Sequence, residues 1–560
     1  MEEIRQVIQT AVKDLFKVDV KPVLTRPDEQ FGDWATNVAL QLAKQLSKNP
    51  REVAQQLADK IKSPAIAKTE VAGPGFINLT LTDKALLGAL KVKPAQSLKN
   101  KVAVAEYSDP NPFKVLHAGH LYTSVVGDAI ANLLETAGAT VHRVNYGGDV
   151  GLHVAKTMWA ILQRLESEKK TYKDLESIPE EERAEWLTEN YIAGSFAYGE
   201  EEKFEEKRRK EIQELNKDIY KIHNEKDHSS ELAQLYWTCR QWSYDYFDNF
   251  YARIGTKFEK YYPESQTVAI GLKTVHEQLA KGVYEKSDGA VVFKAEKFGL
   301  HTRVFINSQG LPTYETKEVG LIMTKWQDYH FDRSVIITGN DIVEYMKVVL
   351  KSIEQFQPEL VKATTHLTHG MVKLQGGAKM SSRKGNILRA VDVLEAAAEA
   401  NKKASGKHDE QVELAAVKYA FLKNRIGGDI IYDPIESVSL EGNSGPYLQY
   451  AHARARSILA KSSPQGQTLQ QGQTLQEGER SLVRKIGEYA EVVDRAVNEL
   501  MPHHVCTYLY ELAQTFNRFY EENRVLGDGR EKLRLALVQS YADTLKNGLS
   551  LLNITAPEKM

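Results

Sequence analysis

The spacing of apolar residues divides the start of the chain into short helices and strands. Apolar residues recur at helical intervals over 2–17 and again over 34–47, which predicts two amphipathic helices. A third helix is expected to begin at Pro50, because proline is favoured in the first helical turn. The strand-like run 77–81 and a polar linker follow, so residues 1–95 are predicted to form a small α+β domain.

Strand and helix periods alternate after the linker. Residues 102–107 predict a strand, 121–136 a helix that ends near Gly138, and 140–145 a second strand. Another helix is expected over 152–166. Strands that alternate with helices are typical of a parallel sheet covered by helices, so this stretch is predicted to be the first half of a nucleotide-binding fold.

The middle of the chain interrupts this alternation. From about 163 to 265 the sequence is densely charged with heptad-like apolar spacing, which predicts an inserted helical hairpin with one face in water. Strands are expected again at 289–293, 302–306 and 334–339, followed by a helix from about 341 to 356. These elements are predicted to complete the fold.

Four domains are therefore expected, which suits a chain of 560 residues. After the first domain comes a sheet domain over 96–375 that contains the insertion. A basic loop and connecting helices are predicted over 376–438, and an all-helical bundle over 439–560.

Composition narrows the class of protein only a little. The chain is 42% hydrophobic with a net charge of −2, as in ordinary globular proteins. It has no run of 18 apolar residues and no basic-then-apolar leader, so neither a membrane helix nor a secretory signal is expected. Two cysteines, Cys239 and Cys506, fit a reducing cytoplasm and argue against a cysteine-based zinc site. The near-neutral charge leaves a nucleic-acid partner open, because such a partner needs only a local basic surface.

The most informative segment is NPFKVLHAGH at 111–120, between the first strand of the predicted sheet and its helix. A helix that starts at the carboxyl end of such a strand presents unpaired N–H groups to phosphates. His117 and His120 are three residues apart and can share one side of the first turn, while Gly119 lets a ligand approach the backbone. Alone, this pattern could also be half of a metal site or a polar helix cap.

A second basic segment, AKMSSRKGN at 378–386, is flanked by glycines. By itself it predicts a solvated loop whose cations suit a polyphosphate. Its Lys379 lies 259 residues after His120 (379 − 120). Together the two segments resemble the signature motifs with which class I aminoacyl-tRNA synthetases hold ATP.

Other segments narrow the resemblance to the arginyl members of that class. FGDWATN and VAGPGFINL, at 31–37 and 71–79, are similar to the extra N-terminal domain of arginyl-tRNA synthetases. SGPYLQYAHARARSIL, at 444–459, is similar to the opening of their anticodon-binding domain, and 551–560 matches their chain end. The blocks stand in the expected order and cover nearly the whole chain.

The resemblance implies a fold and a reaction. The fold is α/β, with a Rossmann-like parallel sheet between a small α+β domain that binds the tRNA body and an all-α anticodon-binding bundle. The reaction is an arginine–tRNA ligase reaction, in which ATP activates L-arginine to arginyl-adenylate and the arginyl group passes to the 3′-terminal ribose of tRNA-Arg. Activation is expected to depend on bound tRNA. Mg²⁺ is expected on the phosphates, zinc is not expected, and a cytoplasmic monomer without membrane attachment is expected.

The resemblance also assigns roles at the ATP site. His117 and His120 would contact the phosphates. The second motif of the class usually has a working lysine at its fourth position, but this chain has Ser382 there. In arginyl enzymes a lysine three residues before the first signature histidine stands in for it, and Lys114 occupies that place. Lys114, assisted by Lys379, is therefore the predicted phosphate-directed cation, with the two basic residues after Ser382 as alternatives. The further predicted ATP contacts are Gly119, the backbone of His369 and Met371, Met380, Ser381, Ser382 and Lys384.

Recognition of arginine calls for a carboxylate, because a guanidinium pairs best with a bidentate acceptor. The family places a tyrosine and an aspartate four residues apart, and this chain has Tyr314 and Glu318 there. Glutamate adds one methylene, so the pocket must differ, and Glu315 competes for the role. Asn111 matches the family residue that holds the substrate amino acid.

Two more segments depart from the family pattern. Where D-x-G-x-Q is expected, the chain has Asp149 and, in place of the glutamine, His153. Asp149 is predicted to contact the α-amino group of the substrate. Around 339–345, where a histidine often touches adenosine, there is none, and Glu344 or Asp341 is expected to contact the ribose.

Aromatic and basic residues near the start of the helical bundle are the predicted tRNA contacts. Aromatic faces and cations suit unstacked bases and phosphates, although each aromatic could equally pack in the bundle core. These residues are Tyr447, Gln449, Tyr450, Arg454 and Arg456.

Two other functions remain open at this stage. Another class I synthetase or a related HxGH nucleotidyltransferase would share the ATP motifs but not the arginyl-type end domains. A non-catalytic tRNA-binding paralogue would not need His117, His120 and Lys379, all of which are intact.

Overall fold

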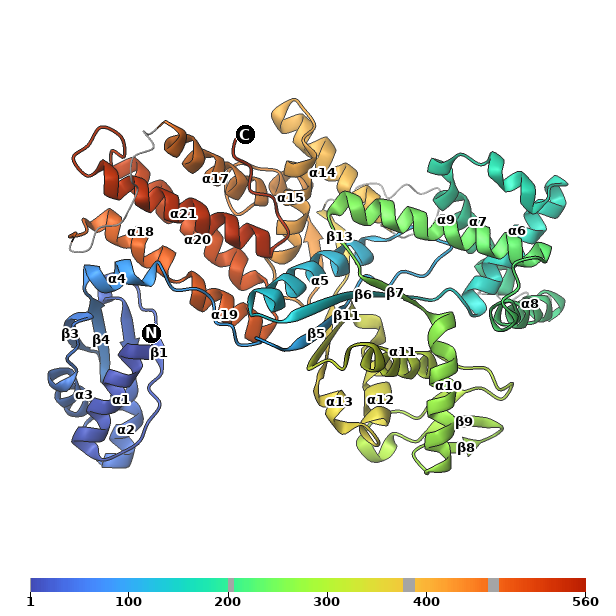
Figure 1. The fold of residues 1–560 in the computed structure, drawn as a ribbon, viewed down its shortest axis with the longest axis horizontal. Helices are drawn as coiled ribbons and strands as arrows, with labels where there is room; N and C mark the ends of the chain where they lie inside the picture. The colour runs from blue at the N-terminus through green and yellow to red at the C-terminus, as the bar shows by residue number, and fades with distance from the viewer. Residues whose placement is uncertain (1, 200–205, 376–387, 462–472) are drawn as a thin grey trace.

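The computed structural model describes residues 2–199, 206–375, 388–461 and 473–560. The domains follow one another across an elongated molecule, with the N-terminal domain at one end and a group of inserted helices at the other (Figure 1). The parallel sheet lies between them, and the C-terminal helices lie beside it. Within the described ranges no helix is long and apolar enough to cross a membrane.

The N-terminal domain combines helices with a four-stranded antiparallel sheet in the order β1-β2-β4-β3. The helix expected over 34–47 is wrong in its first turn: Trp34–Thr36 are buried and form β2, which pairs with β4, and α2 begins at Val38. The helix expected at Pro50 is confirmed, and the Asn49 side chain caps it. The elements are α1 (Glu2–Phe16), β1 (Leu24–Thr25), β2 (Trp34–Thr36), α2 (Val38–Leu46), α3 (Pro50–Lys60), β3 (Ile66–Ala72), β4 (Phe76–Leu81) and α4 (Asp83–Ala89).

A five-stranded parallel sheet forms the centre, in the order β12-β11-β5-β6-β7. The chain builds β5, β6 and β7 outward in one direction and then returns to add β11 and β12 on the other side of β5. The order therefore reverses beside β5, the place where open parallel sheets bind their ligands. The strands are β5 (Val102–Glu106), β6 (Thr140–Gly147), β7 (Lys260–Pro263), β11 (Arg333–Gly339) and β12 (Thr364–His369).

Helices follow the first strands of the sheet, and the first of these helices begins within the HAGH motif. The helix α5 (Ala118–Thr136) follows β5, and α6 (Leu152–Glu168) follows β6, as the sequence predicted. Between α6 and β7 the structure describes three long helices, so the expected hairpin is wrong: they are α7 (Glu180–Tyr198), α8 (Glu206–Glu225) and α9 (Glu231–Ile254).

The strands expected at 289–293 and 302–306 exist but do not join the parallel sheet. They form a separate antiparallel sheet of β8 (Glu285–Ser287), β9 (Ala290–Phe293) and β10 (Arg303–Ile306). Two helices, α10 (Glu264–Ala280) and α11 (Tyr314–Tyr329), flank this sheet in sequence and pack closely together. Their approach depends on glycines, because a Cβ at Gly320 would lie 2.2 Å from the Thr267 carbonyl oxygen and one at Gly271 2.2 Å from that of Thr316.

The other described elements after β11 are one small parallel pair of strands and a series of helices. The pair is β13 (Val372–Leu374) and β14 (Ile430–Tyr432). The helices are α12 (Val343–Glu354), α13 (Pro358–Lys362), α14 (Ala390–Ser405), α15 (Glu410–Leu422), α16 (Pro434–Ser437), α17 (Gly445–Ala460), α18 (Glu477–Gly487), α19 (Tyr489–Glu499), α20 (His503–Glu522) and α21 (Glu531–Leu551).

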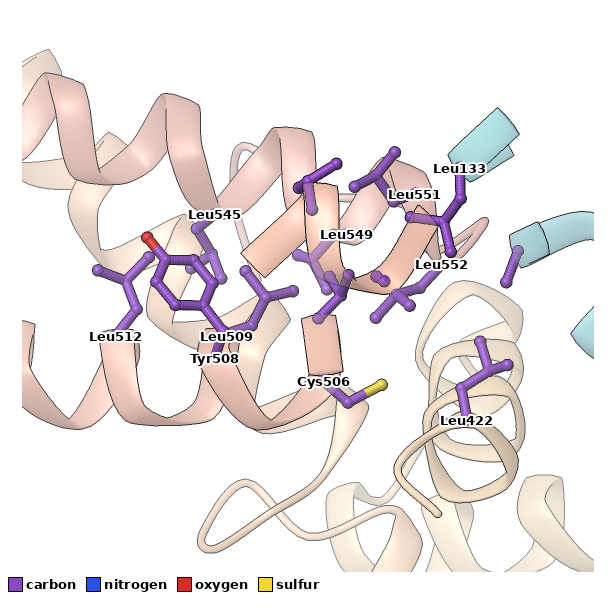
Figure 2. Packing of buried hydrophobic residues seen from close by; sticks show 14 of the residues in the cluster. Leu133, Leu422, Cys506, Tyr508, Leu509, Leu512, Leu545, Leu549, Leu551 and Leu552 are labelled. Carbon is purple, nitrogen blue, oxygen red and sulfur yellow. The ribbon is translucent and has the colours of Figure 1, made fainter. Parts of the chain in front are cut away.

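One hydrophobic core joins the sheet domain to the C-terminal helices. Leu133 of α5 and Leu422 of α15 lie in the same cluster as Cys506, Leu549 and Leu552 (Figure 2). The helix that carries His120 is therefore packed directly against the bundle that the sequence assigned to tRNA recognition.

Candidate active site

The loop between β5 and α5 is held in an unusual backbone conformation. Ser108, Asp109 and Phe113 have φ of 73°, 48° and 71°, a region that residues other than glycine rarely adopt. Side chains of the loop bind the end of β6: Asp109 Oδ1 accepts the Tyr146 N–H at 2.8 Å, and Asn111 Oδ1 accepts the Gly148 N–H at 2.9 Å. The structure thus places Asn111 at the carboxyl edge of the sheet.

The two histidines of the HAGH motif form one unit at the start of α5. Their rings stack with centroids 3.6 Å apart, and the His117 N–H donates to His120 Nδ1 at 3.1 Å. This bond makes His120 Nδ1 an acceptor, so the ring proton sits on Nε2. A Cβ at position 119 would lie 2.9 Å from the His117 ring, so Gly119 is what allows the ring to fold over the helix start.

Both histidines are uncharged at neutral pH. Burial, followed by the charge of Lys114 and the nearby His369, lowers the pKa of His117 to about 4. Burial, His117 and Lys114 hold the pKa of His120 well below its ordinary value. Burial also lowers the pKa of Lys114 itself. The site therefore offers a phosphate two neutral N–H donors beside one amine.

His369 ends β12 and joins this group. It is buried, its Nε2 lies 2.7 Å from the hydroxyl oxygen of Thr123 on α5, and its ring packs edge-on against Tyr122 at 4.5 Å. The expected contact between adenine and the Met371 N–H is wrong for this structure, because that group donates to Asp429 Oδ1 at 2.8 Å. The Met371 side chain is exposed.

The second signature segment, 378–386, lies outside the described residues. Lys379, Met380, Ser381, Ser382 and Lys384 lie within 376–387, so the roles predicted for them stay predictions. The chain is described again from Leu388, whose carbonyl oxygen accepts the Ala118 N–H at 2.8 Å, and the Ala390 N–H donates to the Leu116 carbonyl oxygen at 2.9 Å. Residues 388–390 therefore lie directly against the HAGH motif.

Three carboxylates gather at the carboxyl end of β5: Glu106 and Glu318 are buried, and Asp109 is half-buried. Glu106 ends the strand and forms an ion pair with the fully buried Lys325. Burial, with Glu106 as the next cause, raises the pKa of both Asp109 and Glu318. For Glu318 the raised pKa is about 8. Each of the three carboxylates thus feels the charge of a neighbour, while Lys325 is the cation that reaches them.

Glu318 is the family-predicted arginine ligand that the structure places in this group. Its Oε2 accepts a hydrogen bond from the Tyr345 hydroxyl at 3.1 Å. Glu315, the alternative candidate for binding the guanidinium, instead forms an ion pair with Arg303 at 3.4 Å. Tyr314 stays half-exposed beside His153, with its hydroxyl 3.4 Å from Nδ1.

One predicted substrate contact is not available. Asp149 is fully buried, with one oxygen accepting the Ser265 N–H at 2.9 Å and the other bound by Arg240 at 2.9 Å and by the Ser265 hydroxyl at 2.7 Å. It supports the scaffold rather than a substrate amino group, so this assignment is corrected. Glu344 lies on the exposed side of α12 and pairs with Lys347 at 2.6 Å, and its predicted ribose contact stays a prediction.

Three family models match the chain in sequence order. The model described as the arginyl tRNA synthetase N-terminal domain covers residues 2–81, and that of the DALR anticodon-binding domain covers 448–560. The model of the class I tRNA synthetase (R) catalytic domain covers 82–436, more than half of the chain. The chain belongs to the arginyl-tRNA synthetase family.

Curated relatives and solved structures of the family agree over the full length. The arginine–tRNA ligase of Bdellovibrio bacteriovorus is 30% identical over 98% of this chain and 95% of its own length. That of Phocaeicola vulgatus is 28% identical over 100% and 99%. The structure of the arginyl-tRNA synthetase from Thermus thermophilus matches with a TM-score of 0.79 and 26% identity, covering 100% of both chains.

The residues predicted to contact tRNA divide into exposed and internal ones. Gln449 is a correction: it is fully buried, and its amide donates to the carbonyl oxygens of Gln411 and Thr555 at 3.3 and 2.9 Å. Tyr447 accepts a bond from Asn517 at 2.9 Å inside the bundle. Tyr450 is 43% exposed, enough for its ring to meet a base.

Two cations complete the predicted set. The Arg454 guanidinium lies over the Tyr520 ring, 4.7 Å from its centroid. Arg456 pairs with Glu558 near the chain end at 2.5 Å. Of the predicted tRNA residues, the structure therefore leaves Tyr450, Arg454 over the Tyr520 ring, and Arg456 as the surface candidates.

The sequence reasoning missed Glu106, Asp109 and Tyr345. Glu106 and Asp109 stand beside the quoted motif, and two acidic residues at the end of a buried strand were a signal that could have been used. Tyr345 had no such signal, because only folding brings α12 against α11. The described residues hold no cluster of three or more histidines, cysteines or acids able to ligate a metal.

Proposed function

We infer that this chain is an arginine–tRNA ligase that uses ATP, as its family membership implies, and that the carboxylates of Glu106, Asp109 and Glu318 form its arginine pocket. Unpaired charge in a protein interior is costly, so such a group calls for a cationic partner. Within the described residues Lys325 meets Glu106, which leaves Asp109 and Glu318 without a cation of their own. A free arginine brings two cationic groups, its guanidinium and its α-ammonium.

The lack of a cationic partner for Asp109 and Glu318 is the main support for the proposal, because it favours a substrate with a cationic side chain. A guanidinium can use the Glu318 oxygen that Tyr345 leaves free. An apolar or acidic amino acid would leave the carboxylates unpaired and would be rejected strongly at the binding step.

The neighbouring histidines suit the first chemical step. The carboxylate of arginine attacks the α-phosphorus of ATP, the bond to the β-phosphate breaks, and pyrophosphate leaves. The nucleophile is already ionised, so no base is needed, and the protein contributes position and stabilisation of negative charge. The Nε2–H of His120, the ring of His117 and the amine of Lys114 are proposed to meet the phosphate oxygens.

The second step needs a hydroxyl of the terminal tRNA ribose, which attacks the carbonyl carbon of the adenylate and releases AMP. Mg²⁺ is proposed to enter with ATP, held by the phosphates, because the described residues contain no metal-ligating cluster of their own. We propose that activation depends on bound tRNA and that the protein acts as a monomer in the cytoplasm.

The test is ATP–pyrophosphate exchange with each amino acid in turn, with and without total tRNA. Exchange that requires arginine and tRNA together, followed by arginylation of the tRNA, is the expected result. Brisk exchange with arginine alone would contradict the dependence on tRNA. Exchange with a different amino acid would contradict the pocket assignment, and tRNA binding without any exchange would indicate a non-catalytic paralogue.

A further inference from the structure

The inserted helix α7 touches the loop that leads into the HAGH motif. Its Thr188 hydroxyl oxygen accepts the backbone N–H of Val115 at 2.8 Å. The same hydroxyl donates to the Ala184 carbonyl oxygen, one turn back along α7, at 2.8 Å. Since Val115 separates Lys114 from Leu116 and His117, this bridge fixes the backbone from which two phosphate-directed side chains project.

The same helix reaches the chain just beyond the second signature segment. Glu185 forms an ion pair with Arg389, which is also paired with Asp392 in the first turn of α14 at 2.5 Å. Arg389 itself lies opposite His117 in an isolated β-bridge. One side chain of α7 therefore holds Arg389 at the place where it lies opposite His117.

A third residue of α7 continues this row. The ring of Tyr191 lies 5.3 Å from the Lys114 ammonium nitrogen, within reach of a cation–π contact. Glu185, Thr188 and Tyr191 are three residues apart, so they share one side of the helix.

The helix is itself firmly seated. It packs against α6, and a Cβ at Gly194 would lie 2.0 Å from the Lys156 carbonyl oxygen. Two residues of the neighbouring α9 hold the same loop, because Ser243 accepts the Phe113 N–H at 2.9 Å and the Tyr246 hydroxyl accepts the Leu116 N–H at 3.3 Å. The insertion is thus built as a rigid support for the loop.

We propose that Glu185, Thr188 and Tyr191 of α7 are positioning residues of the ATP site, which hold Lys114, the HAGH motif and Arg389 in register. None of the three needs to touch ATP. The proposal rests on the proposed function, because these segments serve ATP only if the chain activates an amino acid.

Thr188 offers a matched pair of variants. Thr188→Val keeps the shape of the side chain but leaves the partly buried Val115 N–H without an acceptor, and we expect kcat/KM for ATP in arginine- and tRNA-dependent exchange to fall about tenfold. KM for arginine and for tRNA should stay within about twofold, because their sites are not moved. Thr188→Ser restores the hydroxyl and should return kcat/KM for ATP to within about threefold of wild type.

Glu185→Gln supplies an independent variant in case Thr188→Val fails to fold. Removing its charge weakens the ion pair with Arg389, and kcat/KM for ATP should again fall about tenfold with arginine and tRNA unaffected. Glu181→Gln, on the exposed first turn of the same helix, is the control and should match wild type.

The outcomes separate the two proposals. A wild-type protein without arginine-dependent exchange would contradict the proposed function. A fully active wild type whose Thr188→Val and Glu185→Gln variants keep their kcat/KM for ATP would contradict the positioning role. Equal losses for ATP, arginine and tRNA would also contradict it, since they would indicate general damage to the fold.

Discussion

Burial decides which side chains at the site carry charge. It lowers the pKa of His117 to about 4 and that of His153 to about 3, so both are neutral hydrogen-bonding groups at pH 7. It raises the pKa of Glu318 to about 8, with Glu106 as the next cause. A carboxyl group with such a pKa is mostly protonated at neutral pH and ionises when a cation arrives.

The affinity for arginine should therefore depend on pH through Glu318. The folded pKa lies above the ordinary value of 4.5, so free protein holds a proton there between about pH 4.5 and 8. A bound guanidinium favours the ionised form, so binding releases that proton and tightens as pH rises toward 8, by at most about tenfold per unit. Isothermal titration calorimetry between pH 6 and 8, in buffers of different ionisation enthalpy, measures both the affinity and the released proton.

Two variants make this prediction specific. Glu318→Gln cannot ionise, so its arginine affinity should be weaker and its dependence on pH shallower than that of wild type. Glu344→Gln changes an exposed carboxylate paired with Lys347 and should keep the wild-type slope. Equal slopes for wild type and Glu318→Gln would remove Glu318 from the pocket.

The same pKa shift has a consequence for stability. The folded protein binds more protons at Glu318 than the unfolded chain does between about pH 4.5 and 8, so the contribution of this group to the free energy of unfolding falls as pH rises through that window. The ionised Glu318 carboxylate thus lowers the free energy of unfolding as long as no cationic substrate is bound beside it.

Packing between helices sets the position of Glu318. It lies on α11, and α11 approaches α10 closely because Gly320 and Gly271 have no side chain. The sequence predicted helical character here but gave no signal for the contact, since the two glycines are 49 residues apart (320 − 271). The strands between them, expected in the parallel sheet, instead form the separate sheet β8–β10 because they pair with one another as hairpins.

Gly320→Ala should separate α10 from α11. Its methyl group would lie 2.2 Å from the Thr267 carbonyl oxygen, so the helices must move, at a cost of about 1–3 kcal/mol in the free energy of unfolding. Arginine KM should rise because Glu318 moves with its helix, while ATP KM changes less. Urea unfolding and steady-state kinetics check both effects.

Gly88→Ala is the matched control for that substitution. Gly88 lies in the helix α4 and has no neighbour within 4 Å of the added Cβ. Alanine should be neutral or stabilise by about 0.5–1 kcal/mol there. Equal effects of the two substitutions would contradict the close-packing argument.

The N-terminal domain is fixed to the C-terminal bundle by charged contacts. Asp33 is buried, and its Oδ2 accepts the Leu81 N–H at 2.7 Å and an Arg480 N–H at 2.6 Å. Arg480 also binds Asp83 at 2.8 Å. Asp33 lies in the FGDWATN segment, so a residue of a segment that resembles the family at the sequence level is among those that join these two domains.

Asp33→Ala should loosen this junction. It leaves Leu81 N–H and Arg480 without their carboxylate, a loss of about 3 kcal/mol for a buried charged contact. Both domains are proposed to grip tRNA, so KM for tRNA should rise about tenfold while kcat at saturating tRNA stays within about threefold. Aminoacylation kinetics over a range of tRNA concentrations gives both values.

Arg480→Met breaks the same contact from the other side and should reproduce the effect. Asp59→Ala, which removes an exposed carboxylate bonded to Gln55 at 3.0 Å, is the control and should behave as wild type. An unchanged KM for tRNA in both Asp33→Ala and Arg480→Met would contradict a role of the junction in binding tRNA.

The sequence by itself determined the order of strands and helices, the family and the position of the HAGH motif. These features follow from local spacing and from short motifs, which can be recognised without knowledge of the fold. It also pointed to Glu318, whose predicted contact with arginine stays a proposal.

The tertiary structure alone decided which charges meet. It brought Glu106 and Asp109 of the β5 end to Glu318 of α11 and removed Asp149 and Gln449 from the candidate contacts by burying and pairing them. It also set α7 against the loop before the HAGH motif and against Arg389. Electrostatic energy depends on distance and burial, and both are set between segments far apart in the chain.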